Sequence, residues 1–151
     1  MTRLLATWFG CGLAPWAPGT VASAAALLPA YLLHRAAGLS GTGFLWLALL
    51  FVVPAVWSAG RLEASSGRKD PSIVVIDEVV GQWVALAGVA SHNWLSWLGA
   101  FLLFRLLDIW KAPPARRLER LRGGLGIVAD DIIAGAYAAL ALHMAGRLDL
   151  Y

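Results

Sequence analysis

The stretch IVVIDEVVGQWVALAGVA, residues 73–90, combines an apolar run of helical length with two adjacent carboxylates, Asp77 and Glu78. A helix that faced lipid along its whole length would not carry these acids, because each ionisable group in hydrocarbon costs roughly 2.5 kcal/mol or more. We therefore expect this segment to lie inside a bundle of membrane helices, with its acidic start facing an internal site.

The chain as a whole is strongly apolar. Of its 151 residues, 60% are hydrophobic and 14% are charged, and the mean hydropathy is +0.70. In a soluble domain, charged residues make up about a quarter of the composition. One membrane domain over residues 1–151 explains these values. The net charge of +3 is small, and the basic residues lie in short loops, so no nucleic-acid surface is indicated.

Periodic apolar segments predict an all-α, polytopic membrane bundle of about four to five short helices. Several segments are shorter than the ~20 residues that a full span needs. The Gly- and Pro-rich stretch at residues 10–19 is expected to be re-entrant or interfacial, because the backbone of an irregular loop cannot face lipid. The apolar segments run approximately over residues 20–33, 43–59, 73–90, 94–107 and 127–145.

The basic residues predict an orientation in the membrane. If the five segments alternate in direction, Arg35 and Arg147 lie on one side and the other ten Lys and Arg residues on the opposite side. Such a bias places the cation-rich side in the cytoplasm. All the polar motifs fall on this same side. The ten residues are Arg3, Arg61, Arg68, Lys69, Arg105, Lys111, Arg116, Arg117, Arg120 and Arg122.

Two motifs place a carboxylate at an expected helix start and a glycine one turn later. They are Asp77 with Gly81, and Asp131 with Gly135. Residues at i and i+4 share a helix face, so the two glycines would let the helices approach just below the acids. Carboxylates that close repel one another unless a cation lies among them, and an all-oxygen set favours Mg²⁺ or Mn²⁺ over zinc. The alternative is that the acids only cap helices. The acids expected to converge are Asp77, Glu78, Asp130 and Asp131.

A third motif, FRLLDIWK at residues 104–111, carries Arg105, Asp108 and Lys111 at helical spacing. The three would lie within about 120° on one helix face. A carboxylate flanked by two cations suits one metal contact together with clamps on phosphate oxygens. The alternative is a cationic helix end with an internal ion pair.

Two further stretches could bind a phosphate through backbone amides. Thr20 is expected to cap the first long helix, and Gly124 and Gly126 are expected in a glycine turn before the helix that carries Asp130 and Asp131. Ordinary turns are the alternative for both stretches.

Taken together and in this order, four motifs resemble the phosphatidylglycerophosphatase A family of bacterial membrane enzymes. The motifs are GxGLxP…PGT (10–20), IVxxDExxGxW (73–83), FRxxDxWK (104–111) and GGxGIxxDDxxAG (123–135). One departure is Lys111-Ala112-Pro113-Pro114, where the family pattern has Lys-Pro-x-Pro.

The resemblance implies Mg²⁺-dependent removal of the terminal phosphate from phosphatidylglycerophosphate, which gives phosphatidylglycerol at the cytoplasmic face of the bacterial inner membrane. The implied metal ligands are Asp77, Glu78, Asp108 and Asp131. The implied catalytic residues are Asp130, Asp131, Arg105 and Lys111, with Asp130 as a ligand or as the base that orients water. Substrate contacts are expected from Arg105, Lys111, Thr20, Gly124 and Gly126.

Two other functions remain as alternatives. A CDP-alcohol phosphotransferase would need an Asp-Gly-x-x-Ala-Arg run, which is absent. A small cation transporter would carry its acids near the middle of the spans, whereas these acids lie at segment ends on one side.

Overall fold

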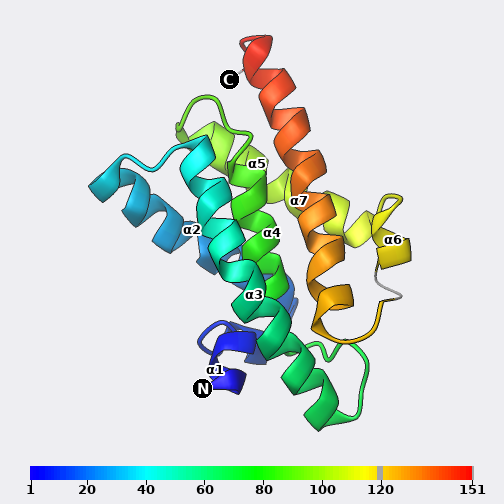
Figure 1. The fold of residues 1–151 in the computed structure, drawn as a ribbon. Coiled ribbons are helices and arrows are strands. Elements are labelled where there is room, and N and C mark those ends of the chain that lie inside the picture. The colour runs from blue at the N-terminus through cyan, green and yellow to red at the C-terminus, as the bar shows by residue number, and fades with distance from the viewer. Residues whose placement is uncertain (119–120, 151) are drawn as a thin grey trace.

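The computed structural model describes residues 1–118 and 121–150, and this part of the chain folds entirely into helices and loops, without a β-strand (Figure 1). The all-α prediction is confirmed. The elements are α1 (Thr2–Ala6), η1 (Cys11–Leu13), α2 (Pro18–Ala37), α3 (Gly41–Ser66), α4 (Ile76–Leu86), α5 (Trp94–Trp110), α6 (Ala115–Leu118) and α7 (Gly124–Arg147).

The prediction of about four to five helices is wrong, because the described residues form seven α-helices. The five longer ones correspond to the five apolar segments. The other two, α1 and α6, have only five and four residues and too little apolar sequence to show a helical period. Two helices, α3 and α7, are long and apolar enough to cross a membrane by length and composition.

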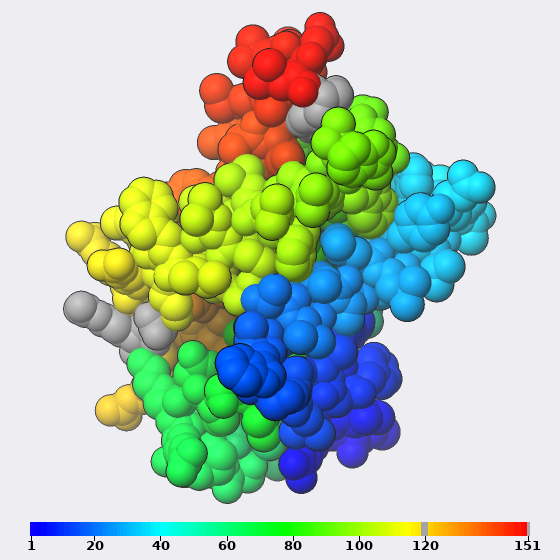
Figure 2. Space-filling view, turned by 180° about the vertical axis from the view of Figure 1, so that it is seen from behind, coloured from blue at the N-terminus to red at the C-terminus, as the bar shows by residue number. Residues whose placement is uncertain are grey.

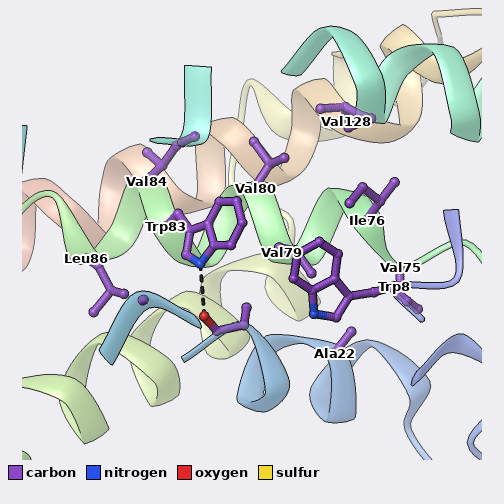
Figure 3. Close-up of a cluster of buried hydrophobic side chains, with 14 of the residues drawn as sticks. Trp8, Ala22, Val75, Ile76, Val79, Val80, Trp83, Val84, Leu86 and Val128 are labelled. Carbon is purple, nitrogen blue, oxygen red and sulfur yellow. Dashed lines mark hydrogen bonds between the residues drawn. The ribbon is translucent and has the colours of Figure 1, made fainter. Parts of the chain in front are cut away.

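The apolar stretch at residues 73–90, which contains α4, forms the centre of the bundle. Every residue of α4 except Glu78 is buried. At 11 residues, or roughly 16 Å, the helix is too short to cross a bilayer. Trp83 packs edge-on against Trp8 and donates a hydrogen bond from Nε1 to the carbonyl of Ala26 at 2.9 Å (Figure 3). Its ring also packs edge-on against Phe51. These contacts fix α4 against α2, α3 and the N-terminal segment.

Helices α4 and α7 cross at their glycines. A Cβ atom added to Gly135 would lie 2.4 Å from the Gly81 carbonyl oxygen, and one added to Gly81 would lie 2.8 Å from the carbonyl oxygen of Asp131. Only glycine permits this approach of the two backbones. The prediction that the two glycine faces meet just below the acids is therefore confirmed.

The long elements alternate in direction through the bundle. The N-terminus, the α3–α4 connection and the start of α7 lie at one end, and the α2–α3 and α4–α5 connections and the C-terminus lie towards the other (Figure 1). Apart from Arg35 and Arg147, the arginine and lysine residues of the described part therefore gather at the end that carries the acidic motifs.

Candidate active site

A cavity of about 320 Å³ lies at the cation-rich end of the bundle. Seen from behind, the surface is hollowed between the yellow end of α5, the green segment that follows α3 and the blue start of α2 (Figure 2). The cavity wall consists of Pro18, Gly19, Asp70, Ser72, Val74, Asp77, Glu78, Asp108, Ile109, Lys111, Asp130 and Asp131. Every acidic residue predicted for the site thus contributes to one cavity.

Three of these acids lie close enough to share one ion. Oxygens of Asp77, Glu78 and Asp131 lie within 4.8 Å of one another. Asp77 and Glu78 project from the first turn of α4, and Asp131 projects from α7 beside the glycine crossing. Asp77 is 8% exposed and Asp131 is 3% exposed, so little water screens the repulsion between their charges.

One oxygen of each of these three acids has no hydrogen-bond partner among the described residues. Within the described part of the chain, Asp77 Oδ1, Glu78 Oε2 and Asp131 Oδ2 are buried and accept no hydrogen bond. A buried acceptor without a partner costs about 1–3 kcal/mol, and more when it is charged. Mg²⁺ and Mn²⁺ prefer such oxygen ligands. The donor set therefore fits a hard divalent cation.

Arg105 lies behind the cavity wall. Its guanidinium pairs with Asp108 on the same helix, as the spacing predicts, and its Nη1 lies 3.8 Å from Glu78 Oε1. Gly19 covers this pair: a Cβ atom there would lie 2.0 Å from Glu78 Oε1 and 3.2 Å from Arg105 Nη1. Arg105 is not among the residues that line the cavity, although both acids that it contacts are. Its predicted catalytic and substrate-binding role stays a prediction.

Lys111 does not share a helix face with Arg105 and Asp108, contrary to the prediction. Helix α5 ends at Trp110, and Lys111 caps it in the left-handed conformation with φ of 51°. The change of chain direction turns the side chain towards α7, where Nζ donates to Asp130 Oδ2 at 3.0 Å. The result is a cation at the cavity wall next to a carboxylate of the neighbouring helix.

The helix starts near the other predicted residues also differ from expectation. Helix α7 begins at Gly124, so Asp131 lies about two turns inside it rather than at its start. The prediction of a glycine turn at Gly124 and Gly126 is therefore wrong. A Cβ atom on Gly124 would lie 1.9 Å from the Val56 carbonyl oxygen, so the absence of a side chain there lets α7 pack closely against α3.

The proposed capping role of Thr20 is wrong as well. Ala17 precedes the first turn of α2, Pro18 begins it, and no side chain caps the helix. Thr20, Gly124 and Gly126 are not part of the cavity wall, so their predicted contacts with a substrate gain no support from their positions.

Sequence reasoning missed part of the wall. Asp70 and Ser72 come from the α3–α4 connection, and Pro18 and Gly19 come from the start of α2. The signal for Asp70 was its place just before an acidic motif, next to Pro71. The signal for Gly19 was the Pro-Gly-Thr end of the first motif.

Comparison with known proteins agrees with these motifs. The sequence model described as phosphatidylglycerophosphatase A matches residues 4–146. The chain is 36% identical to "Phosphatidylglycerophosphatase A" of Escherichia coli, over 96% of this chain and 83% of the relative. It is 37% identical to the protein of the same name from Haemophilus influenzae, over 91% of this chain and 84% of the relative.

A third relative carries a different name. The chain is 38% identical to "Putative phosphatidylinositol-3-phosphatase" of Bacteroides thetaiotaomicron, over 94% of this chain and 91% of the relative. No solved structure matches the chain. The family match covers nearly the whole chain and all four motifs, and we conclude that this protein belongs to the phosphatidylglycerophosphatase A family.

Proposed function

We propose that this protein is a membrane phosphatase that hydrolyses phosphatidylglycerophosphate to phosphatidylglycerol and inorganic phosphate. Family membership over residues 4–146 is the main support for this class of reaction. The cavity agrees with it, because buried carboxylates and a lysine at the cation-rich end suit a phosphate group better than an apolar ligand. Family membership also argues against a cation transporter and a CDP-alcohol phosphotransferase.

The proposed cofactor is Mg²⁺, held by Asp77, Glu78 and Asp131. The three buried oxygens without hydrogen-bond partners support this assignment, since a bound cation would satisfy all of them. The bound ion would polarise the phosphate oxygens and favour ionisation of the attacking water. Asp108 stays a predicted fourth ligand. It lines the cavity and contacts Asp131 as well as Arg105.

Asp130 is proposed to accept a proton, and Lys111 is proposed to neutralise the charge of the phosphate. Asp130 Oδ2 accepts from Lys111 at 3.0 Å, while its Oδ1 is buried and has no partner among the described residues. In this proposal, Asp130 Oδ1 would accept the proton of an attacking water. The Lys111 ammonium lies on the same wall and would neutralise charge on the phosphoryl group.

The substrate is proposed to enter from the cytoplasmic leaflet of the bacterial inner membrane. The cavity lies at the end where arginines and lysines gather, which is the cytoplasmic end by the positive-inside rule. Leu106, Ile109 and Trp110 at the end of α5 are each more than 60% exposed. These apolar side chains beside the cavity would contact acyl chains while the headgroup reaches the acids.

The name of the Bacteroides relative favours a second candidate substrate, a phosphatidylinositol 3-phosphate. Both lipids carry a phosphate monoester on the headgroup, so the same acids and lysine could act on either. The ratio of kcat/KM for the two lipids in the same detergent decides between them.

Phosphate release from phosphatidylglycerophosphate tests the proposal. The full chain in detergent should release phosphate with Mg²⁺ present, lose the activity with a chelator, and recover it when Mg²⁺ is restored. Asp131→Asn and Asp77→Asn should each lower kcat by about 100-fold or more, while both variants still insert into membranes. Activity that persists in excess chelator would contradict the metal assignment but not the phosphatase activity.

A further inference from the structure

A second groove, with two arginines in its wall, lies at the same end of the bundle, between α1 and the last turns of α3. Its volume is about 500 Å³, and its wall includes Arg3, Arg61, Ser65, Ser66 and Ile73. The active-site cavity shares none of these residues. Ser72 and Val74 face the cavity and Ile73 faces the groove, so one short segment separates the two.

The two arginines of this groove differ in their ion pairing from the basic residues near the active site. Arg105 and Lys111 are paired with acids, whereas neither Arg3 nor Arg61 forms an ion pair with any described residue. The groove wall contains no carboxylate among the described residues. Two cations with no acid between them therefore face one opening and attract an anion.

An apolar cleft adjoins the groove along the same helices. Its volume is about 210 Å³, and Leu4, Leu5, Phe9 and Trp57 belong to its wall. Trp57 and Arg61 lie one turn apart and share a face of α3. In α1, Thr2 and Arg3 line the groove, whereas Leu4 and Leu5 line the cleft. The junction of α1 and α3 thus offers cations and then an apolar surface, in the order of a phospholipid headgroup and its acyl chain.

We propose that the junction of α1 and α3 binds one anionic phospholipid, with its phosphate between Arg3 and Arg61 and an acyl chain against Phe9 and Trp57. The cytoplasmic leaflet supplies such lipids, and each basic side chain near an anionic surface favours binding about five-fold. The half-exposed Trp57 lies where an amphipathic ring suits the boundary between headgroups and acyl chains. The site is distinct from the substrate cavity.

Photolabelling of the full chain tests this site. The protein is placed in nanodiscs of phosphatidylcholine with a small fraction of phosphatidylglycerol that carries a photoreactive acyl chain, and labelled peptides are mapped. Label is expected within residues 1–9 and 53–66, and unlabelled phosphatidylglycerol should compete for it far better than added phosphatidylcholine. Equal competition by the two lipids, or label confined to the active-site segments, would overturn the proposal.

Matched variants separate specific binding from general charge. Arg3→Gln with Arg61→Gln should weaken phosphatidylglycerol binding about 25-fold, whereas Arg35→Gln with Arg147→Gln removes the same charge at the other end and should leave binding unchanged. Arg3→Lys with Arg61→Lys should keep most of the binding. Phosphate release should stay at the wild-type rate in all three pairs, which shows that they fold. Undiminished labelling of the Gln pair at residues 1–9 would overturn the site.

Discussion

The glycine crossing between α4 and α7 gives a sharp test, because it places the acids of two helices beside each other. In Gly135→Ala, the new methyl group would lie 2.4 Å from the Gly81 carbonyl oxygen and 3.0 Å from Val84 Cβ. Relief of the first contact to about 3.4 Å requires the helices to separate by roughly 1 Å. Such overpacking costs about 1–3 kcal/mol, partly offset by the better helix propensity of alanine, about 1 kcal/mol.

The same separation should damage the active site. Asp131 lies one turn before Gly135, and Asp77 lies one turn before Gly81, so a shift at the crossing moves the carboxylates apart. A misplacement of about 1 Å can cost about 100-fold in rate. We expect Gly135→Ala to lower kcat by about 10- to 100-fold and to raise the Mg²⁺ concentration that gives half-maximal activity.

Phosphate release titrated with Mg²⁺ and thermal unfolding in detergent measure both effects. Gly99→Ala is the matched control. Gly99 is also a helical glycine, and its added Cβ would make only an ordinary contact of 3.7 Å with Leu142. The control should keep full activity and gain up to about 1 kcal/mol of stability. Wild-type activity and Mg²⁺ dependence in Gly135→Ala would refute the packing argument.

Three further substitutions test separate parts of the site and the core. Gly19→Ala should displace Glu78, because the added Cβ would lie 2.0 Å from Glu78 Oε1, and a Mg²⁺ titration of activity should show a higher requirement for the ion. Lys111→Met should lower kcat by about 100-fold and leave Mn²⁺ affinity within a few-fold of wild type, since the lysine contacts Asp130 rather than the three-carboxylate group. An equal loss of both quantities would contradict that separation. Trp83→Phe should destabilise the fold by about 1–3 kcal/mol in chemical unfolding, because the indole hydrogen bond to the Ala26 carbonyl is lost and the smaller ring leaves a void, with unchanged kcat for the folded fraction.

The sequence predicts the centre of the site better than its borders. The convergence of Asp77, Glu78 and Asp131 follows from two local patterns, an acid and a glycine four residues apart on each of two apolar helices. The ion pair of Arg105 and Asp108 also follows from local spacing along one helix.

The predictions that were wrong or incomplete concern features that depend on contacts between distant segments. Gly124 begins α7 and packs closely against the α3 backbone, whereas local composition predicts a turn there. Lys111 reaches Asp130 because α5 ends one residue earlier and the chain turns through a left-handed conformation. Asp70 joins the site through an irregular connection, which carries no periodic signal.

Binding of Mn²⁺ to the full chain in detergent, followed by electron paramagnetic resonance, tests the central claim most directly. We expect one high-affinity Mn²⁺ site, from which Mg²⁺ displaces the bound Mn²⁺. Asp77→Asn and Asp131→Asn should each weaken Mn²⁺ binding by at least about ten-fold. Glu63→Gln, outside the cavity wall, should leave Mn²⁺ binding unchanged. Mn²⁺ affinity that is unchanged in both Asn variants would contradict the claim that acids from α4 and α7 hold one shared ion.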